Sequence, residues 1–198
     1  MARFVEPVTL RGAHATLEPL QGEHVDALRE AAEDGELWRL WYTSVPAPDR
    51  VEAYVSTALK LRENAHEMPF VVRENGDGTI VGSTRYMNVV PEHRRVEIGT
   101  TWYAKRVQRT AVNTDCKLLL LTHAFEVLEC IAVEFRTSWF NFRSREAIAR
   151  LGAKQDGVLR NHQITPDGVY RDTVVFSILE SEWPQVKRNL RFMLDRPR

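Results

Sequence analysis

The sequence has 198 residues, of which 43% are hydrophobic and 27% are charged, a composition typical of a globular protein. Its 27 lysines and arginines balance 27 aspartates and glutamates, which argues against nucleic acid or a membrane surface as a partner. No segment reaches the roughly 20 apolar residues that span a membrane. The N-terminal residues lack the apolar core of a signal peptide, so a cytoplasmic protein is expected.

The hydrophobic pattern predicts one domain, residues 1–198, in which strands and helices alternate. Period-two alternation and turn residues predict strands at residues 8–10, 15–20, 69–74, 79–90, 94–103, 132–137, 158–162 and 170–179. Helical spacing of apolar residues predicts helices at residues 22–33, 49–63, 113–128, 141–151 and 181–194. Tight links such as Asn75-Gly76-Asp77-Gly78 predict an antiparallel meander. The expected fold class is α/β (α+β), with a mixed, mostly antiparallel central sheet of six to seven strands flanked by helices.

The strongest functional signal lies in residues 97–121. A predicted strand leads there into a loop that carries Lys105, Arg106 and Arg109, and the loop leads into an apolar helix. A helix N-terminus presents unpaired backbone N–H groups, which together with cations favour an anion such as a pyrophosphate. The alternative is a solvated basic loop. The spacings of a Walker A loop and of a Rossmann fingerprint are both absent.

Five segments resemble the GNAT acetyltransferases, and within them the RimJ/RimL-like branch that is named for ribosomal-protein acetylation. They are LRGAHATLEPL, GTIVGSTRYMNV, EIGTTWYAKRVQRTAVNTDCKLLLLTHAFEVL, NFRSREAIARLGAKQDGVLR and DGVYRDTVVFSI, and together they cover nearly the whole chain. The resemblance implies an N-acetyltransferase that uses acetyl-CoA. The acetyl group would pass directly to a primary amine, either a protein N-terminus or a small molecule.

The resemblance also implies which residues bind coenzyme A. The family's pyrophosphate loop has the form [QR]xxGx[GA], which is occupied here by Gln108, Arg109, Thr110, Ala111, Val112 and Asn113. The loop departs from the family pattern, because Ala111 replaces the glycine and Asn113 the last small residue. Further implied cofactor contacts are Gly99, Thr101, Trp102, Thr114, Asn141 and Arg145. Gly99 is also expected to mark a β-bulge where a ligand approaches the strand backbone.

Two residues are implied to be catalytic. Glu97 would act as the general base, because a protonated amine has no lone pair with which to attack a thioester. Ser144 would protonate the departing thiolate. The alternatives are that Glu97 pairs with a nearby arginine, and that Asn141 and Ser144 only open a helix.

Four residues are candidates for contact with the acceptor: Trp41, Tyr42, Arg85 and Tyr86. Core packing is the alternative for the aromatic side chains. The six histidines are scattered and no metal-binding spacing occurs, so no metal site is expected. Cys116 and Cys130 are expected to be buried thiols. Exposed strand edges and the last helix are compatible with a homodimer.

Two other functions remain open at this stage. A non-catalytic protein that binds acyl-CoA on the same fold is suggested by the changed residues Ala111 and Asn113. A nucleotide-dependent kinase is less favoured, because the sequence shows neither a Walker lysine nor a set of Mg²⁺-binding carboxylates.

Overall fold

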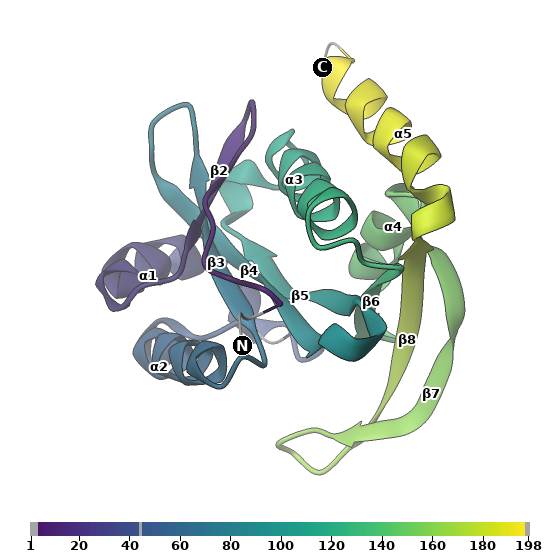
Figure 1. Cartoon of the computed structure of the whole chain (residues 1–198). Helices are drawn as coiled ribbons and strands as arrows, with labels where there is room; N and C mark the ends of the chain where they lie inside the picture. The colour runs from purple at the N-terminus through teal and green to yellow at the C-terminus, as the bar shows by residue number, and fades with distance from the viewer. Residues whose placement is uncertain (1–3, 44, 197–198) are drawn as a thin grey trace.

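Eight strands form one sheet in the computed structural model, which describes residues 4–43 and 45–196 (Figure 1). They are β1 (Leu10–Arg11), β2 (Ala15–Pro19), β3 (Met68–Glu74), β4 (Ile80–Val90), β5 (Arg95–Tyr103), β6 (Ala132–Ser138), β7 (Lys154–Ile164) and β8 (Tyr170–Leu179). Their spatial order is β1-β2-β3-β4-β5-β6-β8-β7. Only the pair β5–β6 is parallel among these strands. The mixed, mostly antiparallel sheet is therefore confirmed, with all eight predicted segments in it rather than six or seven.

Five α-helices pack on the two faces of the described sheet (Figure 1). They are α1 (Val25–Glu33), α2 (Val51–Glu63), α3 (Val112–Glu126), α4 (Phe142–Arg150) and α5 (Trp183–Asp195). One face carries α1 against β4 and α2 against β3, and the other carries α3, which also packs on α5. Within the described residues, no helix has the length and apolar character needed to cross a membrane.

Several element boundaries differ from the predicted ones. The helix predicted from residue 49 begins with a 3-10 turn, Pro48–Arg50, and α2 itself starts at Val51 without a side-chain cap. Strand β7 is longer than the predicted residues 158–162 at both ends. Most of its side chains are exposed, so the apolar pattern carried little information about its length.

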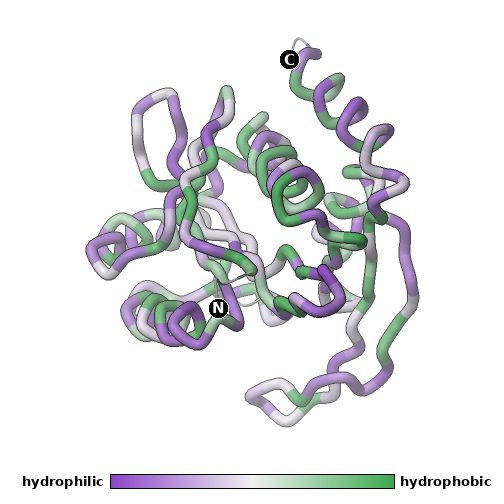
Figure 2. Tube along the Cα trace, in the orientation of Figure 1, coloured by the Kyte–Doolittle hydropathy of each residue, from purple (hydrophilic) through white to green (hydrophobic). Residues whose placement is uncertain are grey.

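The apolar core occupies both faces of the sheet, and on one of them α3 contributes more buried residues than any other described helix. Figure 2 shows α3 as one of the most hydrophobic helices, and ten of its fifteen residues are buried. Tyr86 of β4 is fully buried on this face and donates a hydrogen bond of 2.6 Å to the backbone oxygen of Leu120. Cys116 and Cys130 are free, buried thiols, and burial raises the pKa of each to about 12.

The parallel pair β5–β6 is short. The strands pair at Arg95 with Ala132, at Val96 with Val133 and at Glu97 with Glu134, and no pairing continues beyond Glu97. The two strands therefore diverge, and the backbone of β5 from residue 98 onward has an edge that β6 does not cover.

A β-bulge lies in β5 at this point of divergence. Gly99 pairs with Arg85 and Trp102 with Ser83, so β5 has one residue more than β4 over this stretch. Thr100 takes a left-handed conformation with φ of 47°. The bulge expected at Gly99 is thus confirmed. It also changes which side chains face α3, since Val96 and Ile98 face the core before it and Thr101 contacts α3 after it.

Asp115 fixes the start of α3 to the turn between β1 and β2. This carboxylate is 3% exposed, and its Oδ2 accepts hydrogen bonds from the backbone N–H groups of His14 (2.6 Å) and Ala15 (3.0 Å). We expect Asp115→Ala to lower the free energy of unfolding by about 2–4 kcal/mol, because two donors lose a charged acceptor. A urea titration measures this change. Asp115→Asn keeps one acceptor oxygen and should recover part of the loss, whereas equal stability of all three proteins would contradict the assignment.

Candidate active site

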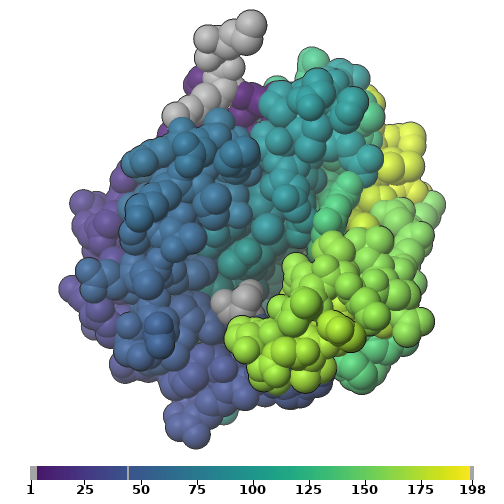
Figure 3. All heavy atoms as spheres, turned by 90° about the horizontal axis from the view of Figure 1, so that it is seen from below, coloured from purple at the N-terminus to yellow at the C-terminus, as the bar shows by residue number. Residues whose placement is uncertain are grey.

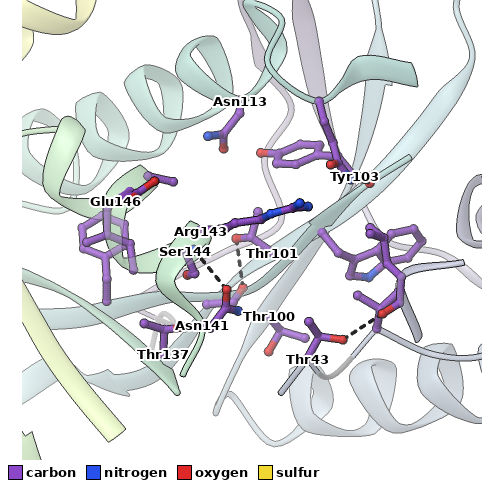
Figure 4. Close-up of a pocket in the computed structure, with 18 of the residues that line it drawn as sticks. Thr43, Thr100, Thr101, Tyr103, Asn113, Thr137, Asn141, Arg143, Ser144 and Glu146 are labelled. Carbon is purple, nitrogen blue, oxygen red and sulfur yellow. Dashed lines mark hydrogen bonds between the residues drawn. The ribbon is translucent and has the colours of Figure 1, made fainter. Parts of the chain in front are cut away.

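A cavity of about 680 Å³ lies between the diverging strands β5 and β6. Figure 3 shows the molecule hollowed between its N-terminal half and the β7–β8 hairpin. Figure 4 shows Asn141, Arg143 and Ser144 of α4 on one side of the cavity, and Thr100, Thr101 and Tyr103 of β5 on the other. The start of α3 lies at one end of the cavity, and the segment from Leu37 to Thr43 supplies another wall.

The loop before α3 lies at one end of the cavity. Arg109 has a left-handed φ of 61°, whereas Ala111 is right-handed helical with φ of −69°. Within the described residues, the backbone N–H groups of Ala111, Asn113 and Thr114 have no hydrogen-bond acceptor. These donors are the unpaired groups of a helix N-terminus. Those of the partly exposed Ala111 and Asn113 suit the oxygens of a phosphate, whereas Thr114 is fully buried. Alanine at position 111 fits this conformation without strain, because its φ is negative.

Three arginines of the cavity lining come from this loop and from α4: Arg109, Arg143 and Arg150. The guanidinium of Arg150 donates to the hydroxyl of Thr114 at 3.3 Å. Of the three loop cations singled out in the sequence, only Arg109 lines the cavity. Arg106 instead pairs with Glu74 and Asp77 in the β3–β4 turn region. The donor set fits a group with several phosphates, such as coenzyme A.

Two residues at the start of α4 contribute to the cavity wall. Asn141 caps α4, because its Oδ1 accepts a hydrogen bond of 3.1 Å from the backbone N–H of Ser144. Both residues line the cavity. The predicted cap is confirmed, and the amide Nδ2 of Asn141 remains available as a donor to a bound molecule.

Glu97 lies where β5 and β6 begin to diverge, and it is 4% exposed. Its Oε2 accepts a hydrogen bond from Asn88 at 2.7 Å and lies 3.5 Å from the guanidinium of Arg136. Burial raises the pKa of Glu97 above its usual value, although Asn88 and Arg136 act in the opposite direction. The arginine partner of Glu97 therefore comes from the neighbouring strand β6.

Gly99 connects Glu97 to the cavity. Glu97 is not part of the cavity lining, but Gly99 is. A Cβ on Gly99 would stand 3.1 Å from Oε1 of Glu97 and 2.5 Å from the sulfur of Met87. Both contacts of Glu97 described above use Oε2. The missing side chain at position 99 therefore leaves Oε1 next to the cavity, where it can accept a proton.

Lys117 of α3 also lines the cavity, and the sequence reasoning missed it. Its ammonium is buried and donates a hydrogen bond of 2.9 Å to the hydroxyl of Thr101, which in turn lies 2.7 Å from that of Thr84. Burial lowers the pKa of Lys117 to about 8. A signal was present, because Lys117 follows Asn113 by one helical turn and is the one charged residue between Cys116 and Leu121.

The structure brings most of the predicted cofactor residues together. Those that line the cavity are Gly99, Thr101, Trp102, Gln108, Arg109, Thr110, Asn113 and Asn141. Val112 and Thr114 are buried behind the loop. Arg145 is placed outside the cavity, where its guanidinium stacks on the rings of Trp139 and Phe142.

The predicted acceptor residues are less well grouped. Tyr42 lines the cavity, whereas Trp41 is 67% exposed and contacts Phe140 with ring centroids 5.5 Å apart. Arg85 is buried in an ion pair of 2.6 Å with Glu67 and borders a separate, smaller pocket. Tyr86 faces the core on the side of α3, so it cannot contact an acceptor at this cavity.

Two further arginines on neighbouring strands line the cavity and were missed, Arg136 of β6 and Arg171 of β8. The alternation of polar and apolar residues along 132–138 indicated that Arg136 faces away from the core. The two side chains line this cavity because β5 and β6 diverge, and no local sequence pattern predicts that divergence.

Residues 14–154 match the protein family described as Acetyltransferase (GNAT) domain. A protein of Bacillus subtilis (strain 168) named "Putative ribosomal N-acetyltransferase YdaF" is 32% identical over 107 residues, which cover 54% of this chain and 57% of that protein. The chain thus matches little more than half the length of this curated relative. The resemblance to the GNAT acetyltransferases is confirmed by the family match, and the name of this relative supports the RimJ/RimL-like branch.

Solved structures with the same fold include a GCN5-related N-acetyltransferase from Brucella melitensis. Its TM-score is 0.86 at 27% identity, and the alignment covers 96% of this chain and 86% of that one. RimJ of Mycobacterium smegmatis, solved in complex with CoA-disulfide, has a TM-score of 0.79 at 21% identity, with 94% and 95% of the two chains covered. At this lower identity the similarity to RimJ shows the fold alone.

The lowered pKa of Lys117 has a consequence for stability. Lys117 keeps its proton up to about pH 10.5 in the unfolded chain but releases it near pH 8 in the folded protein. The cost of burying its charge therefore lowers the free energy of unfolding most below pH 8. We expect Lys117→Met to raise the free energy of unfolding by about 1–3 kcal/mol at pH 7. Urea titrations at pH 7 and pH 10 measure the difference, which should shrink as the wild type gains stability between these values. A gain that does not depend on pH would contradict a buried ammonium.

Proposed function

The chain belongs to the GNAT acetyltransferase family, and we propose that it is an N-acetyltransferase that transfers the acetyl group of acetyl-CoA to a primary amine. The observation that carries this proposal is the gap between β5 and β6. The lining of this gap includes Arg109 of the loop before α3 and Arg143 and Arg150 of α4, and Gly99 borders it beside the buried carboxylate of Glu97. We propose a protein or peptide N-terminus as the first acceptor to test, in keeping with the name of the Bacillus subtilis relative.

The residues of the loop and of α4 would hold the cofactor. The N–H groups of Ala111 and Asn113, with Arg109, suit the pyrophosphate, and Arg143 and Arg150 suit the remaining phosphate. The uncovered edge of β5 would bind the pantetheine arm through backbone hydrogen bonds, and Asn141 would add a side-chain amide. The thioester of acetyl-CoA supplies the activated acetyl group.

Glu97 would act as the base. The acceptor amine is protonated in water, and it must transfer this proton before it can attack. Oε1 of Glu97 lies beside the cavity at Gly99, and the raised pKa of this carboxyl brings its basicity closer to that of the amine. Backbone N–H groups at the bulge would stabilise the negative charge that develops on the acetyl oxygen. The hydroxyl of Ser144 would give a proton to the departing thiolate.

The two reactants would approach from opposite faces of the sheet. Glu97 and Gly99 pair with Met87 and Arg85, and Arg85 stacks on Tyr54 of α2. The anion-binding loop, by contrast, belongs to the start of α3 on the other face. This arrangement leaves room for amine and cofactor together and favours direct transfer over an acyl-enzyme.

A non-catalytic protein that binds acyl-CoA is the second candidate, since Ala111 and Asn113 depart from the family loop. The negative φ of Ala111 weakens this candidate, because no glycine is needed there. Calorimetry with acetyl-CoA, followed by a thiol-release assay over peptides and small amines, separates the two. Binding without release of thiol from any amine would favour the non-catalytic protein.

Cofactor affinity tests the assignment of the arginines on α4. We expect Arg143→Met and Arg150→Met each to weaken acetyl-CoA binding by about tenfold, because each removes a charged donor from the cavity. Arg145→Met is the matched control, since Arg145 lies on the same helix but outside the cavity. Isothermal titration calorimetry gives the three constants. Equal losses in all three variants would refute a specific role for the residues that line the cavity.

The base assignment predicts a separation of chemistry from binding. We expect Glu97→Gln to lower kcat by about 100-fold or more, with acetyl-CoA affinity unchanged. In the wild type, kcat/KM should fall with decreasing pH at a pKa above 4.5, and the variant should lack this limb. Glu134→Gln is the control, because Glu134 pairs with the same Arg136 at 2.9 Å. Undiminished turnover in Glu97→Gln would disprove the assignment.

A further inference from the structure

We infer that the preferred acceptor carries a carboxylate close to the amine that is acetylated, and that Arg171 binds this carboxylate. The inference rests on the proposed function and names the class of acceptor. It starts from the charges that line the cavity within the described residues. The lining contains one carboxylate, that of Glu146, and six cationic side chains. The cations are Arg109, Lys117, Arg136, Arg143, Arg150 and Arg171.

The cofactor accounts for only part of this excess of positive charge. Arg109, Arg143 and Arg150 lie at the α3–α4 end, where the helix N–H groups suit phosphates. Lys117 is hydrogen-bonded to Thr101. The two remaining cations come from β6 and β8, on the side of the cavity where Glu97 lies, and the phosphates of the cofactor do not explain them.

Arg136 is neutralised within the protein, whereas Arg171 is not. Arg136 lies 3.5 Å from Glu97 and 2.9 Å from Glu134. Among the described residues, no carboxylate lies within 4.0 Å of Arg171. Its Nη1 donates a hydrogen bond of 2.8 Å to Gln163, but its Nε is buried and has no acceptor. Burial lowers the pKa of Arg171, and the charge of Glu97 acts in the opposite direction.

Arg171 leaves one donor group for a carboxylate in the cavity. Nη1 is engaged with Gln163 and Nε is buried, so Nη2 remains. A hydrogen bond from a guanidinium to a carboxylate is assisted by both charges and is stronger than a neutral one. An amine directed at Glu97 would then have its carboxylate on the side of β8, at Arg171.

This carboxylate has two sources, an acidic side chain near a peptide N-terminus or the α-carboxylate of a free amino acid. The experiment titrates matched pairs of ligands into the protein saturated with coenzyme A. The pairs are peptides that begin Ser-Asp and Ser-Asn, peptides that begin Asp and Asn, and an amino acid with its amide. We expect at least tenfold tighter binding of the acidic member of one pair. The pair that discriminates identifies the source.

Arg171→Met should abolish this preference and leave the affinity for coenzyme A unchanged, which also shows that the variant is folded. Arg171→Lys keeps the charge on a shorter, non-planar group and should recover only part of the preference. Arg160→Met is the control, because Arg160 of β7 is 79% exposed and pairs with Asp172. Equal affinity within every pair, or a preference that survives in Arg171→Met, would overturn the inference. These experiments measure binding and do not depend on turnover. The proposed function is tested separately, and it fails if no amine in the thiol-release assay is acetylated.

Discussion

The short parallel pairing of β5 and β6 is the constraint on which the rest of the site depends. Three residue pairs hold the strands together up to Glu97 and Glu134, and β8 then continues the sheet beside β6 through seven pairs. Strand β6 is therefore held firmly by β8, and β5 by β4, while the two halves separate. A closed sheet would have no room for a cofactor, and a complete break would remove the buried position that raises the pKa of Glu97.

The bulge in β5 changes which side chains point to each face of the sheet. Before the bulge, Val96 and Ile98 contribute to the core under α3, while Glu97 faces the side of α2. After it, Thr101 reaches Lys117 on α3, and Trp102 reaches Tyr54 on α2 with a hydrogen bond of 3.4 Å. A regular strand could not place both sets correctly, because its side chains alternate without interruption. The left-handed Thr100 is the backbone strain that accompanies this change.

Local pattern was enough to predict the elements, the turn at Asn75–Gly78, the helix cap at Asn141 and the bulge at Gly99, because each depends on residues near in sequence. It was not enough for Lys117, Arg136 and Arg171. Their place in the cavity depends on where distant strands diverge. An alternating pattern shows which face of the sheet a side chain is on, but not which strand or helix lies beside it. Tyr86 shows the reverse error, since a polar aromatic residue on the meander suggested an acceptor contact but satisfies its hydroxyl on α3.

Strand β5 also sets a distance in the proposed function. The stretch from Gly99 to Tyr103 would separate the reacting carbonyl from the loop that holds the pyrophosphate, and the left-handed Thr100 interrupts the extended backbone of this stretch. The number of residues between the two ends would therefore determine how long the arm of the acyl carrier must be. Carriers with a shorter arm, such as small acyl phosphates, would not reach both ends, so the length of one strand would select the acyl donor.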